Sequence, residues 1–274
     1  MKPKIVTKKI ETKKGMNSPV KKPIIIGGPC SVESYEIMDK TSNFLKALGV
    51  EYLRGGAYKP RTSPYSFQGL GIQGIDILKD IKDKYGLKIV SEIIDIRDFD
   101  EVMDVVDVIQ IGSRNMYNYP LLKEAGKTNK KILLKRAMSA TIEEWLNAAE
   151  YIALEGNTDI ILCERGIRTF ETYTRNTFDI NCIPVVKQKA NLKIIGDPSH
   201  GTGKRELIEA VGLAAIAAGA DGLIIELHPE PEKAVSDGFQ SLSFEEFEKM
   251  YHKIIKLYNF MNELNKEKIE SFTP

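Results

Sequence analysis

The run DIILCER, residues 159–165, has an apolar middle and a charged end. Residues 160–162 are two isoleucines and a leucine in direct succession, so a strand formed here would present apolar side chains on both faces. Strands of this kind belong to parallel sheets that are covered on both sides. Glu164 and Arg165 place charged groups where the strand would end. The fold therefore depends on how often such a run recurs along the chain.

Seven other short runs share this composition, and helical patterns separate them. The runs are IIIGG at 24–28, EYLRG at 51–55, KIVSEI at 88–93, VIQIGS at 108–113, KILLKR at 131–136, KIIGD at 193–197 and GLIIELH at 222–228. Between two of them, Thr141 and Glu144 form the pattern of a helix-capping box, and Gly156 is placed to end that helix.

Eight strands that alternate with helices, at intervals of roughly 20 to 36 residues, predict a closed (β/α)8 TIM barrel. We therefore expect an α/β protein with a single barrel domain and a short N-terminal extension. An open doubly wound sheet is the alternative, but no G-x-G-x-x-G motif follows the first run.

The composition of the chain ends suggests the domain boundaries. We expect a basic N-terminal extension at residues 1–22 with room for a short strand or hairpin, the catalytic barrel at 23–262, and a charged C-terminal tail at 263–274. The formal charge of the whole chain is only +1, so the positive charge of the N-terminal extension is confined to that segment. It does not indicate a nucleic-acid-binding domain.

Targeting signals and cysteine usage bear on the compartment. No run has the length and apolarity of a secretory signal or a membrane span. The three cysteines lack the spacing of a disulfide framework and fit a reducing compartment. We expect a cytoplasmic protein without nucleic-acid or membrane partners.

Each predicted strand is followed by a charged or metal-binding side chain. In chain order these are Cys30, Arg54, Glu92, Arg114, Lys135, Arg165, His200 and Glu226. The carboxyl ends of the strands meet at one face of a barrel, and barrel enzymes place their chemistry there. A polar residue at the end of any one strand needs no functional explanation, but eight together predict a single pocket.

One group of these residues is cationic. It comprises Arg54, Lys59, Arg61, Arg114, Lys135 and Arg165, and the segment from Tyr52 to Ile75 contains no acidic residue. Six cations in one mouth repel each other unless an anionic ligand neutralises them, and the Arg guanidinium suits carboxylate and phosphate oxygens. The pattern predicts a ligand with more than one anionic group, and Thr62 and Ser63 can add hydroxyl donors.

The second group combines a thiol, an imidazole and two carboxylates. Cys30, His200 and Glu226 follow strands one, seven and eight, and Asp237 lies eleven residues past Glu226. Barrel closure would bring these strands together. This donor set suits a divalent transition ion such as manganese, iron, cobalt or zinc, and it does not suit the all-oxygen shells of magnesium or calcium.

Six motifs together give a family resemblance. GPCSVES, KPRTS, IGSRN, CERGIRTFE, DPSHGTGKR and IIELHPEPEKAVSDG occur in order over roughly residues 20–260. They resemble 3-deoxy-D-arabino-heptulosonate 7-phosphate (DAHP) synthase, in its compact type I-beta form related to 3-deoxy-D-manno-octulosonate 8-phosphate (KDO8P) synthase. KPRTS separates the two, because a KANRS-type segment is expected there in the octulosonate enzymes.

The resemblance implies that phosphoenolpyruvate condenses with D-erythrose 4-phosphate and phosphate is released, which is the first step of the shikimate pathway to aromatic amino acids. It implies that Arg114, Lys135 and Arg165 hold the phosphate of phosphoenolpyruvate, and Arg54 and Lys59 its carboxylate end. Arg61, Thr62 and Ser63 would hold the aldose phosphate, with Pro60 and Ser113 completing the substrate-binding set. Cys30, His200, Glu226 and Asp237 match the metal ligands, with manganese the first expectation.

Further roles follow from the implied chemistry. Lys59 lies between the two anion sites, so we expect it to protonate the new hydroxyl, and Glu92 to orient the water. Family members associate, so the resemblance implies a homodimer or homotetramer. Residues 1–23 leave no room for an appended regulatory domain, so we expect insensitivity to phenylalanine and tyrosine.

Three other functions compete with this one. KDO8P synthase would use arabinose 5-phosphate in place of erythrose 4-phosphate. A Schiff-base aldolase could use Lys135, but it would leave the metal set idle. A barrel without catalysis could sense sugar phosphates, although nothing in the sequence favours it.

Overall fold

Eight parallel strands close into a barrel. The structure, a computed structural model, describes residues 22–61 and 63–270. The strands are β1 Ile24–Gly28, β2 Tyr52–Arg54, β3 Lys88–Glu92, β4 Val108–Ile111, β5 Lys131–Lys135, β6 Ile160–Glu164, β7 Lys193–Gly196 and β8 Gly222–Glu226. Each strand pairs with the next, and β8 pairs with β1 along its whole length, from Ile24 opposite Gly222 to Gly28 opposite Glu226. The expected TIM barrel is confirmed, and the open sheet is excluded.

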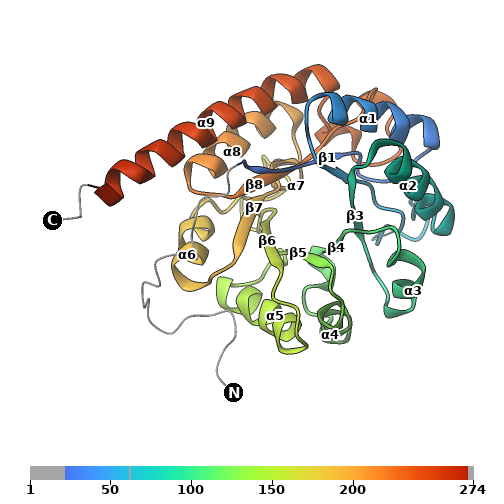
Figure 1. The fold of residues 1–274 in the computed structure, drawn as a ribbon, viewed down its shortest axis with the longest axis horizontal. Helices are drawn as coiled ribbons and strands as arrows, with labels where there is room; N and C mark the ends of the chain where they lie inside the picture. The colour runs from blue at the N-terminus through green and yellow to red at the C-terminus, as the bar shows by residue number, and fades with distance from the viewer. Residues whose placement is uncertain (1–21, 62, 271–274) are drawn as a thin grey trace.

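Helices surround this barrel as an outer ring (Figure 1). Their bounds are α1 Tyr35–Ala47, α2 Ile72–Tyr85, α3 Phe99–Val102, α4 Tyr119–Lys127, α5 Ile142–Leu154, α6 Cys182–Lys189, α7 Pro198–Thr202, α8 Arg205–Ala217 and α9 Phe244–Glu270. Short 3-10 turns occur at η1 Ile96–Asp98, η2 Ser113–Asn115, η3 Pro231–Lys233 and η4 Gly238–Gln240. The predicted capping box begins α5. Thr141 Oγ1 accepts a hydrogen bond from the backbone amide of Glu144, and Glu144 Oε2 accepts one from the backbone amide of Thr141.

Two apolar layers stabilise the fold. The outer layer lies between the strands and the helices and includes Trp145 and Phe247, which are fully buried. The inner layer fills the barrel and consists of Ile26, Val90, Val108, Leu133, Ile161, Cys163, Ile195 and Ile224. Burial of aliphatic side chains of this size stabilises the folded state by about 1.5–3 kcal/mol each. The barrel is therefore a packed core below its mouth.

The inner layer determines which residues reach the mouth. Side chains alternate between the two faces of a strand, so the residue two positions after an inner one also turns toward the barrel axis. These steps lead from Val90 to Glu92, Val108 to Gln110, Leu133 to Lys135, Cys163 to Arg165, Ile195 to Asp197 and Ile224 to Glu226, and from Tyr52, which is half-buried against the inner layer, to Arg54. Apolar side chains thus form the floor, and charged or polar side chains stand on it.

Strand β1 ends differently, because Gly28 occupies the position two after Ile26. Its φ is +143°, and a Cβ atom there would lie 2.2 Å from the Arg54 carbonyl oxygen. Only glycine permits this approach of the two backbones. The chain then continues past the strand end, so that Cys30 is the first side chain of this segment at the mouth.

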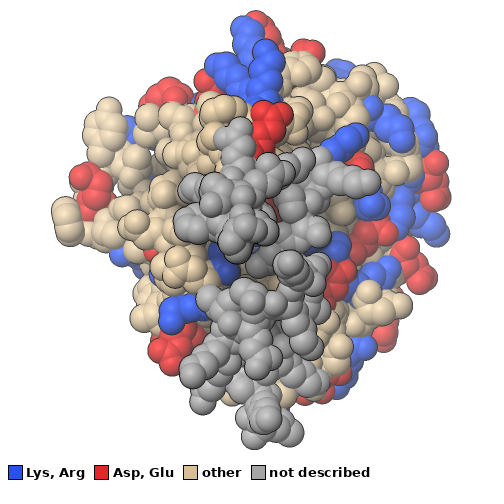
Figure 2. All heavy atoms as spheres, turned by 60° about the vertical axis from the view of Figure 1, so that its left-hand side comes forward, with Lys and Arg blue, Asp and Glu red and all other residues tan. Residues whose placement is uncertain are grey.

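The two ends of the chain bear on the expected domain boundaries to different extents. The predicted N-terminal extension lies outside the described residues, apart from residue 22. Helix α9 continues past position 263, where a charged tail was expected to begin, as far as Glu270. Within 22–61 and 63–270, none of the helices combines the length and apolarity needed to cross a bilayer. Over the described part of the face in Figure 2, cationic and anionic side chains are interspersed.

Candidate active site

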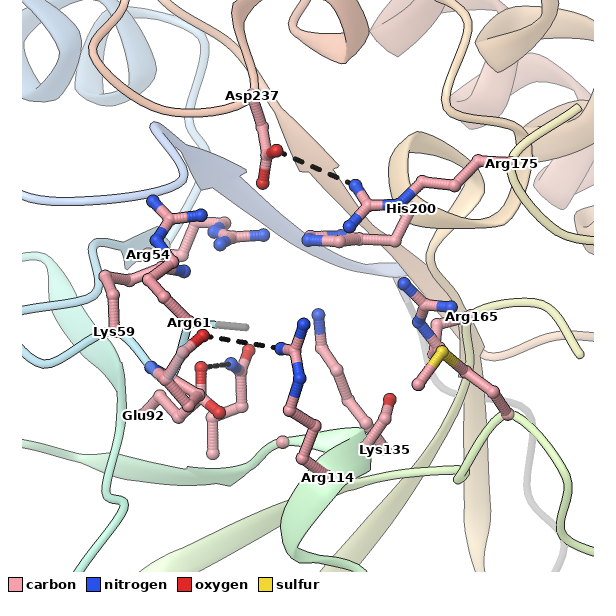
Figure 3. A pocket seen from close by; sticks show the side chains of 15 residues that line it. Arg54, Lys59, Arg61, Glu92, Arg114, Lys135, Arg165, Arg175, His200 and Asp237 are labelled. Atoms are coloured by element: carbon pink, nitrogen blue, oxygen red, sulfur yellow. Dashed lines mark hydrogen bonds and ion pairs between the residues drawn. The ribbon is translucent and has the colours of Figure 1, made fainter. Parts of the chain in front are cut away.

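A pocket opens at the carboxyl ends of the strands and encloses about 640 Å³ of empty space, part of it open to solvent. It is lined by Arg54, Lys59, Pro60, Arg61, Glu92, Gln110, Gly112, Ser113, Arg114, Lys135, Met138, Arg165, Arg175, His200 and Asp237. In Figure 3, Arg54, Lys59 and Arg61 face Lys135 and Arg165 across the cavity, with His200 and Asp237 on a third side. The structure thus brings together side chains from both predicted groups.

The predicted metal ligands form a compact cluster. One donor atom each from Cys30, His200, Glu226 and Asp237 can be chosen so that all four lie within 4.8 Å of one another. Donors bound at about 2.0–2.3 Å to one ion would be separated by up to roughly 4.6 Å, so the spacing fits a shared ion. The thiol of Cys30 donates to Asp237 Oδ2 over 3.1 Å.

The imidazole of His200 is oriented for this cluster. Its Nδ1 lies 2.8 Å from Asp197 Oδ2, a charge contact whose angle is outside hydrogen-bond geometry, and its Nε2 lies 3.4 Å from Glu226 Oε1. Burial lowers the pKa of His200 more than Asp197 and Glu226 raise it, so the ring is neutral at neutral pH. A neutral ring that keeps its proton on Nδ1, toward Asp197, presents the Nε2 lone pair to the cluster.

The carboxylate of Glu226 is also suited to a metal. It is fully buried, and Oε2 accepts a hydrogen bond from Gln240 Nε2 over 2.6 Å. Within the described residues Oε1 has no hydrogen-bond partner, although Arg54 NH1 lies 3.2 Å away in unfavourable geometry. Arg54 offsets the charge, but a buried carboxylate oxygen without a hydrogen bond is still costly, and a metal ion bound to it would remove that cost. The four residues therefore fit a divalent ion.

A second cluster of potential metal ligands is already neutralised by a protein cation. Glu164, Asp179 and Cys182 also approach one another. Arg136 lies between the carboxylates, because its NH1 is 3.0 Å from Glu164 Oε2 and 2.8 Å from Asp179 Oδ2. The guanidinium already neutralises this cluster. We interpret it as an ion pair that joins β5, β6 and the loop before α6.

Two of the predicted cations are tied to the Cys30 segment. Arg54 is almost completely buried, and its NH2 donates to the Cys30 carbonyl oxygen over 3.2 Å. The ammonium of Lys59 donates to the same oxygen over 3.1 Å. Cys30 thus turns its side chain to the metal set and its carbonyl to the cations, so the two predicted groups form one site.

The cations differ in how they are neutralised. Arg54 pairs with Glu226, and Lys135 Nζ lies 2.6 Å from Asp197 Oδ2. Four others have no carboxylate partner among the described residues. Lys59 and Arg114 donate to the carbonyl oxygens of Cys30 and Pro60, Arg61 to the Phe67 carbonyl and the Ser236 hydroxyl, and buried Arg165 NH1 has no partner in this part of the chain. This uncompensated positive charge favours an anionic ligand.

The two predicted hydroxyl donors and the predicted carboxylate differ in their position relative to the pocket. Thr62 lies outside the described residues, and Ser63 is exposed, with its hydroxyl oxygen accepting from the Tyr65 amide over 3.3 Å. Ser63 does not line the pocket, and its predicted role stays a prediction. Glu92 does line it, and its Oε2 accepts from Gln110 Nε2 over 3.3 Å.

Sequence reasoning missed four polar residues of the site, one of which is Gln110, the partner of Glu92 in the pocket lining. Arg175, in the loop between β6 and α6, lines the pocket, lies 3.7 Å from Asp237 and donates to Gln240 over 2.7 Å. Asp197 is fully buried between Lys135 and His200. Burial alone would raise the pKa of Asp197, but His200 and Lys135 outweigh it and hold that pKa well below its ordinary value. A signal existed for Asp197, since it directly follows a predicted strand, but none marked Arg175 or Gln240.

A family model described as the DAHP synthetase I family matches residues 5–263. The chain belongs to this family. The resemblance drawn from the six motifs is thereby confirmed.

Individual members and relatives of the DAHP synthetase I family agree with this assignment. The phospho-2-dehydro-3-deoxyheptonate aldolase of Thermotoga maritima is 56% identical over 233 residues, which is 85% of this chain and 69% of that protein. A 2-dehydro-3-deoxyphosphooctonate aldolase of Desulfotalea psychrophila is 31% identical, over 85% of this chain and 89% of its own length.

Solved structures share the fold. The crystal structure of the Thermotoga maritima aldolase, also called DAHP synthase, superposes with a TM-score of 0.84 at 54% identity and covers 87% of this chain and 70% of its own. A truncated form of the Thermotoga maritima enzyme superposes with a TM-score of 0.81 at 50% identity and covers 87% of both chains. The higher identity to the heptonate enzyme favours the DAHP synthase interpretation over the octulosonate one.

Proposed function

We propose that this chain is a metal-dependent DAHP synthase that condenses phosphoenolpyruvate with D-erythrose 4-phosphate and releases inorganic phosphate. The observation that carries the proposal is one pocket in which four cations without carboxylate partners in the described part of the chain adjoin a complete set of metal ligands. Two phosphorylated substrates supply the missing negative charge. The family match and the Thermotoga relative support the same reaction.

The cations divide between two substrates. Arg114, Lys135 and Arg165 follow β4, β5 and β6, and we assign them to the phosphate of phosphoenolpyruvate. Arg54 and Lys59 are assigned to its carboxylate end. Arg61 extends from the loop after β2, and together with Thr62 and Ser63 it is assigned to the aldose phosphate. Guanidinium and ammonium donors of this kind bind phosphate oxygens through charge-assisted hydrogen bonds.

The reaction begins when carbon 3 of phosphoenolpyruvate attacks the aldehyde carbon, and negative charge then develops on the aldehyde oxygen. Bound by Cys30, His200, Glu226 and Asp237, a divalent ion would supply Lewis acidity to that oxygen. His200 and Asp237 line the pocket together with Lys59, and Lys59 also contacts the Cys30 carbonyl, so the oxygen and a proton donor can meet there. Water adds at carbon 2, and the resulting tetrahedral centre expels phosphate.

Lys59 is the proposed proton donor to the new hydroxyl. Burial alone would lower the pKa of Lys59, but Cys30 and Glu92 outweigh it and raise that pKa, so the amino group is protonated at neutral pH. Glu92, at the end of β3, is the proposed group that orients the attacking water. Its contact with Gln110 fixes one carboxylate oxygen and leaves the other for the water.

A pair of phosphate-release assays tests the proposal. The metal-loaded protein is given phosphoenolpyruvate with either erythrose 4-phosphate or arabinose 5-phosphate. We expect kcat/KM to be at least about tenfold higher for erythrose 4-phosphate. The distance between the reacting aldehyde and Arg61 is fixed by the pocket, so only an aldose of one length can place its phosphate on Arg61. Preference for arabinose 5-phosphate would instead identify an octulosonate synthase, and no release with either sugar would contradict both.

We also propose a native ion, an oligomeric state and a compartment for this protein. Manganese is the first expectation for the native ion, with iron, cobalt and zinc as alternatives, because the mixed thiol, imidazole and carboxylate set accepts each of them. A homodimer or homotetramer is expected from the family. A cytoplasmic location is expected from the cysteine usage of the sequence. Metal analysis and light scattering of freshly purified protein test the first two.

A further inference from the structure

One buried carboxylate contacts both halves of the site. Asp197 follows β7 directly and has no exposed surface. Its Oδ2 accepts a hydrogen bond from Lys135 Nζ over 2.6 Å and lies 2.8 Å from His200 Nδ1, at an angle outside hydrogen-bond geometry. Its Oδ1 accepts the backbone amide of His200 over 3.0 Å. The same oxygen, Oδ2, therefore faces a cation assigned to phosphate and the imidazole assigned to the metal.

The two partners of Asp197 present their other sides to different ligands. Because Nδ1 of His200 faces Asp197, Nε2 is the ring nitrogen that faces Glu226 and the metal set. Lys135 extends into the pocket between Arg114 and Arg165, as Figure 3 shows. A carboxylate that accepts from the distal nitrogen of a ligand imidazole orients the ring and raises the basicity of the ligating nitrogen.

We propose that Asp197 is a positioning residue through which phosphoenolpyruvate and the metal ion strengthen each other's binding. The inference rests on the proposed function, because it takes Lys135 as a phosphate-binding group. Asp197 touches neither substrate nor metal in this scheme. It acts by sharing its oxygen between Lys135 and His200.

The sign of the coupling follows from the competition for that oxygen. A bound phosphate group accepts hydrogen bonds from Lys135, so the ammonium interacts less with Asp197. The carboxylate is then free to turn toward His200 Nδ1 and to accept a well-aligned hydrogen bond from it, and Nε2 becomes a better ligand. Coupling between two sites is reciprocal, so the metal must strengthen phosphoenolpyruvate binding by the same factor.

Asp197 also has a structural role, which the test must separate. It caps the N-terminus of α7 by accepting the His200 amide. Asn at this position keeps an oxygen for the cap but loses the negative charge. Asp197→Asn therefore removes the proposed coupling and keeps the cap.

Calorimetric titration of the full chain with Mn²⁺, with and without phosphoenolpyruvate, measures the coupling factor. Direct attraction between the ion and the anionic substrate contributes in every variant, so the wild-type factor is compared with that of Asp197→Asn. We expect the wild-type factor to be at least about fivefold larger. Glu164→Gln is the matched control, because it removes a buried carboxylate at the end of the neighbouring strand β6 that pairs with Arg136 and is expected to keep the wild-type factor.

A second measurement does not depend on the folding of the Asn variant. The chain has three His residues, so the Nδ1 proton of His200 can be assigned by its loss in His200→Gln. We expect this resonance to move downfield when inorganic phosphate is added to the metal-free wild-type chain, and an unchanged position would overturn the proposal. An Asp197→Asn variant with normal phosphoenolpyruvate binding and wild-type coupling would also overturn it. If wild-type protein bound no phosphoenolpyruvate at all, the proposed function would fail, and this inference with it.

Discussion

Arg61 NH2 donates a hydrogen bond to the hydroxyl of Ser236, 175 positions away in the sequence. Arg61 belongs to the loop after β2, and Ser236 to the loop after β8. Ser236 directly precedes Asp237, which has a φ of 55° and is the one non-glycine residue with positive φ in the described part of the chain. The cation assigned to the aldose phosphate is thus held by the neighbour of a proposed metal ligand.

Ser236→Ala should weaken erythrose 4-phosphate binding. Loss of a hydrogen bond to a charged donor costs about 1.5–3 kcal/mol, and part of this is recovered when Arg61 binds phosphate, so KM for the aldose should rise roughly 3- to 10-fold. KM for phosphoenolpyruvate should change little. Ser66→Ala, at an exposed position of the same loop, is the control for steady-state assays. A rise in both KM values would contradict the assignment of Arg61 to the aldose.

Lys59→Met should reduce kcat by about 100-fold or more at saturating substrate, because general-acid catalysis contributes 10²–10⁴-fold. Single-turnover measurement of phosphate release detects the loss. Lys79→Met, on the exposed face of α2, should keep wild-type turnover. Near-normal turnover of Lys59→Met would show that another group supplies the proton.

Removal of the metal should abolish activity. Incubation with a chelator is expected to inactivate the protein, and addition of Mn²⁺ should restore it, since Cys30, His200, Glu226 and Asp237 remain assembled. Cys30→Ala should fail to retain the ion in metal analysis. The Schiff-base alternative predicts the opposite, namely full activity with chelator and covalent trapping of substrate on Lys135 by borohydride.

Gly28→Ala should destabilise the barrel and displace Arg54. The added Cβ would lie 2.2 Å from the Arg54 carbonyl oxygen, and overpacking of this kind costs about 1–3 kcal/mol beyond the backbone strain of a positive φ. Gly156→Ala is a matched control, because Gly156 has a φ of +122° and a Cβ added there would meet none of the described residues within 4 Å. It should suffer only the strain, of order 1–3 kcal/mol. Equal losses of unfolding free energy in the two variants would refute the steric explanation.

Alkaline pH should destabilise the protein through Tyr258. Burial, followed by the charge of Asp221, raises the pKa of Tyr258 to about 12 in the folded protein. The unfolded chain ionises this tyrosine near its ordinary pKa of about 10, so the stabilisation is complete below pH 10 and is lost between pH 10 and 12, by about 1.4 kcal/mol per pH unit. The melting temperature of Tyr258→Phe should decrease less steeply with pH over this range than that of the wild type. Tyr65→Phe, at a 97% exposed position, should keep the wild-type slope.

Much of the site could be predicted because strand alternation is a local property. The charged residues Arg54, Glu92 and Lys135 end strands whose apolar residues two positions earlier fill the barrel. Once the strands are recognised, closure of the ring brings such residues together without further information. In the predicted metal set only Glu226 follows this alternation, and the pairing of β1 with β8 brings the segment that carries Cys30 beside it.

The residues that sequence reasoning missed depend on long-range contacts. Asp197 pairs with Lys135, 62 positions away, and Arg175 contacts Gln240, 65 positions away. Arg175 lies in a loop, where no periodicity indicates the direction of a side chain. Ser63 is a near neighbour of Arg61 in sequence, but it is exposed and lies outside the pocket lining, so closeness in sequence does not by itself bring a side chain into the pocket.

The pairing of β8 with β1 has a consequence for biosynthesis. A ribosome delivers the chain from its N-terminus, so Cys30 is made early, whereas Glu226 and Asp237 emerge only after the other strands. A nascent chain that lacks β8 offers a thiol and an imidazole but no carboxylate from this set. We therefore expect high-affinity binding of the ion only by the finished polypeptide, after all eight strands have been made.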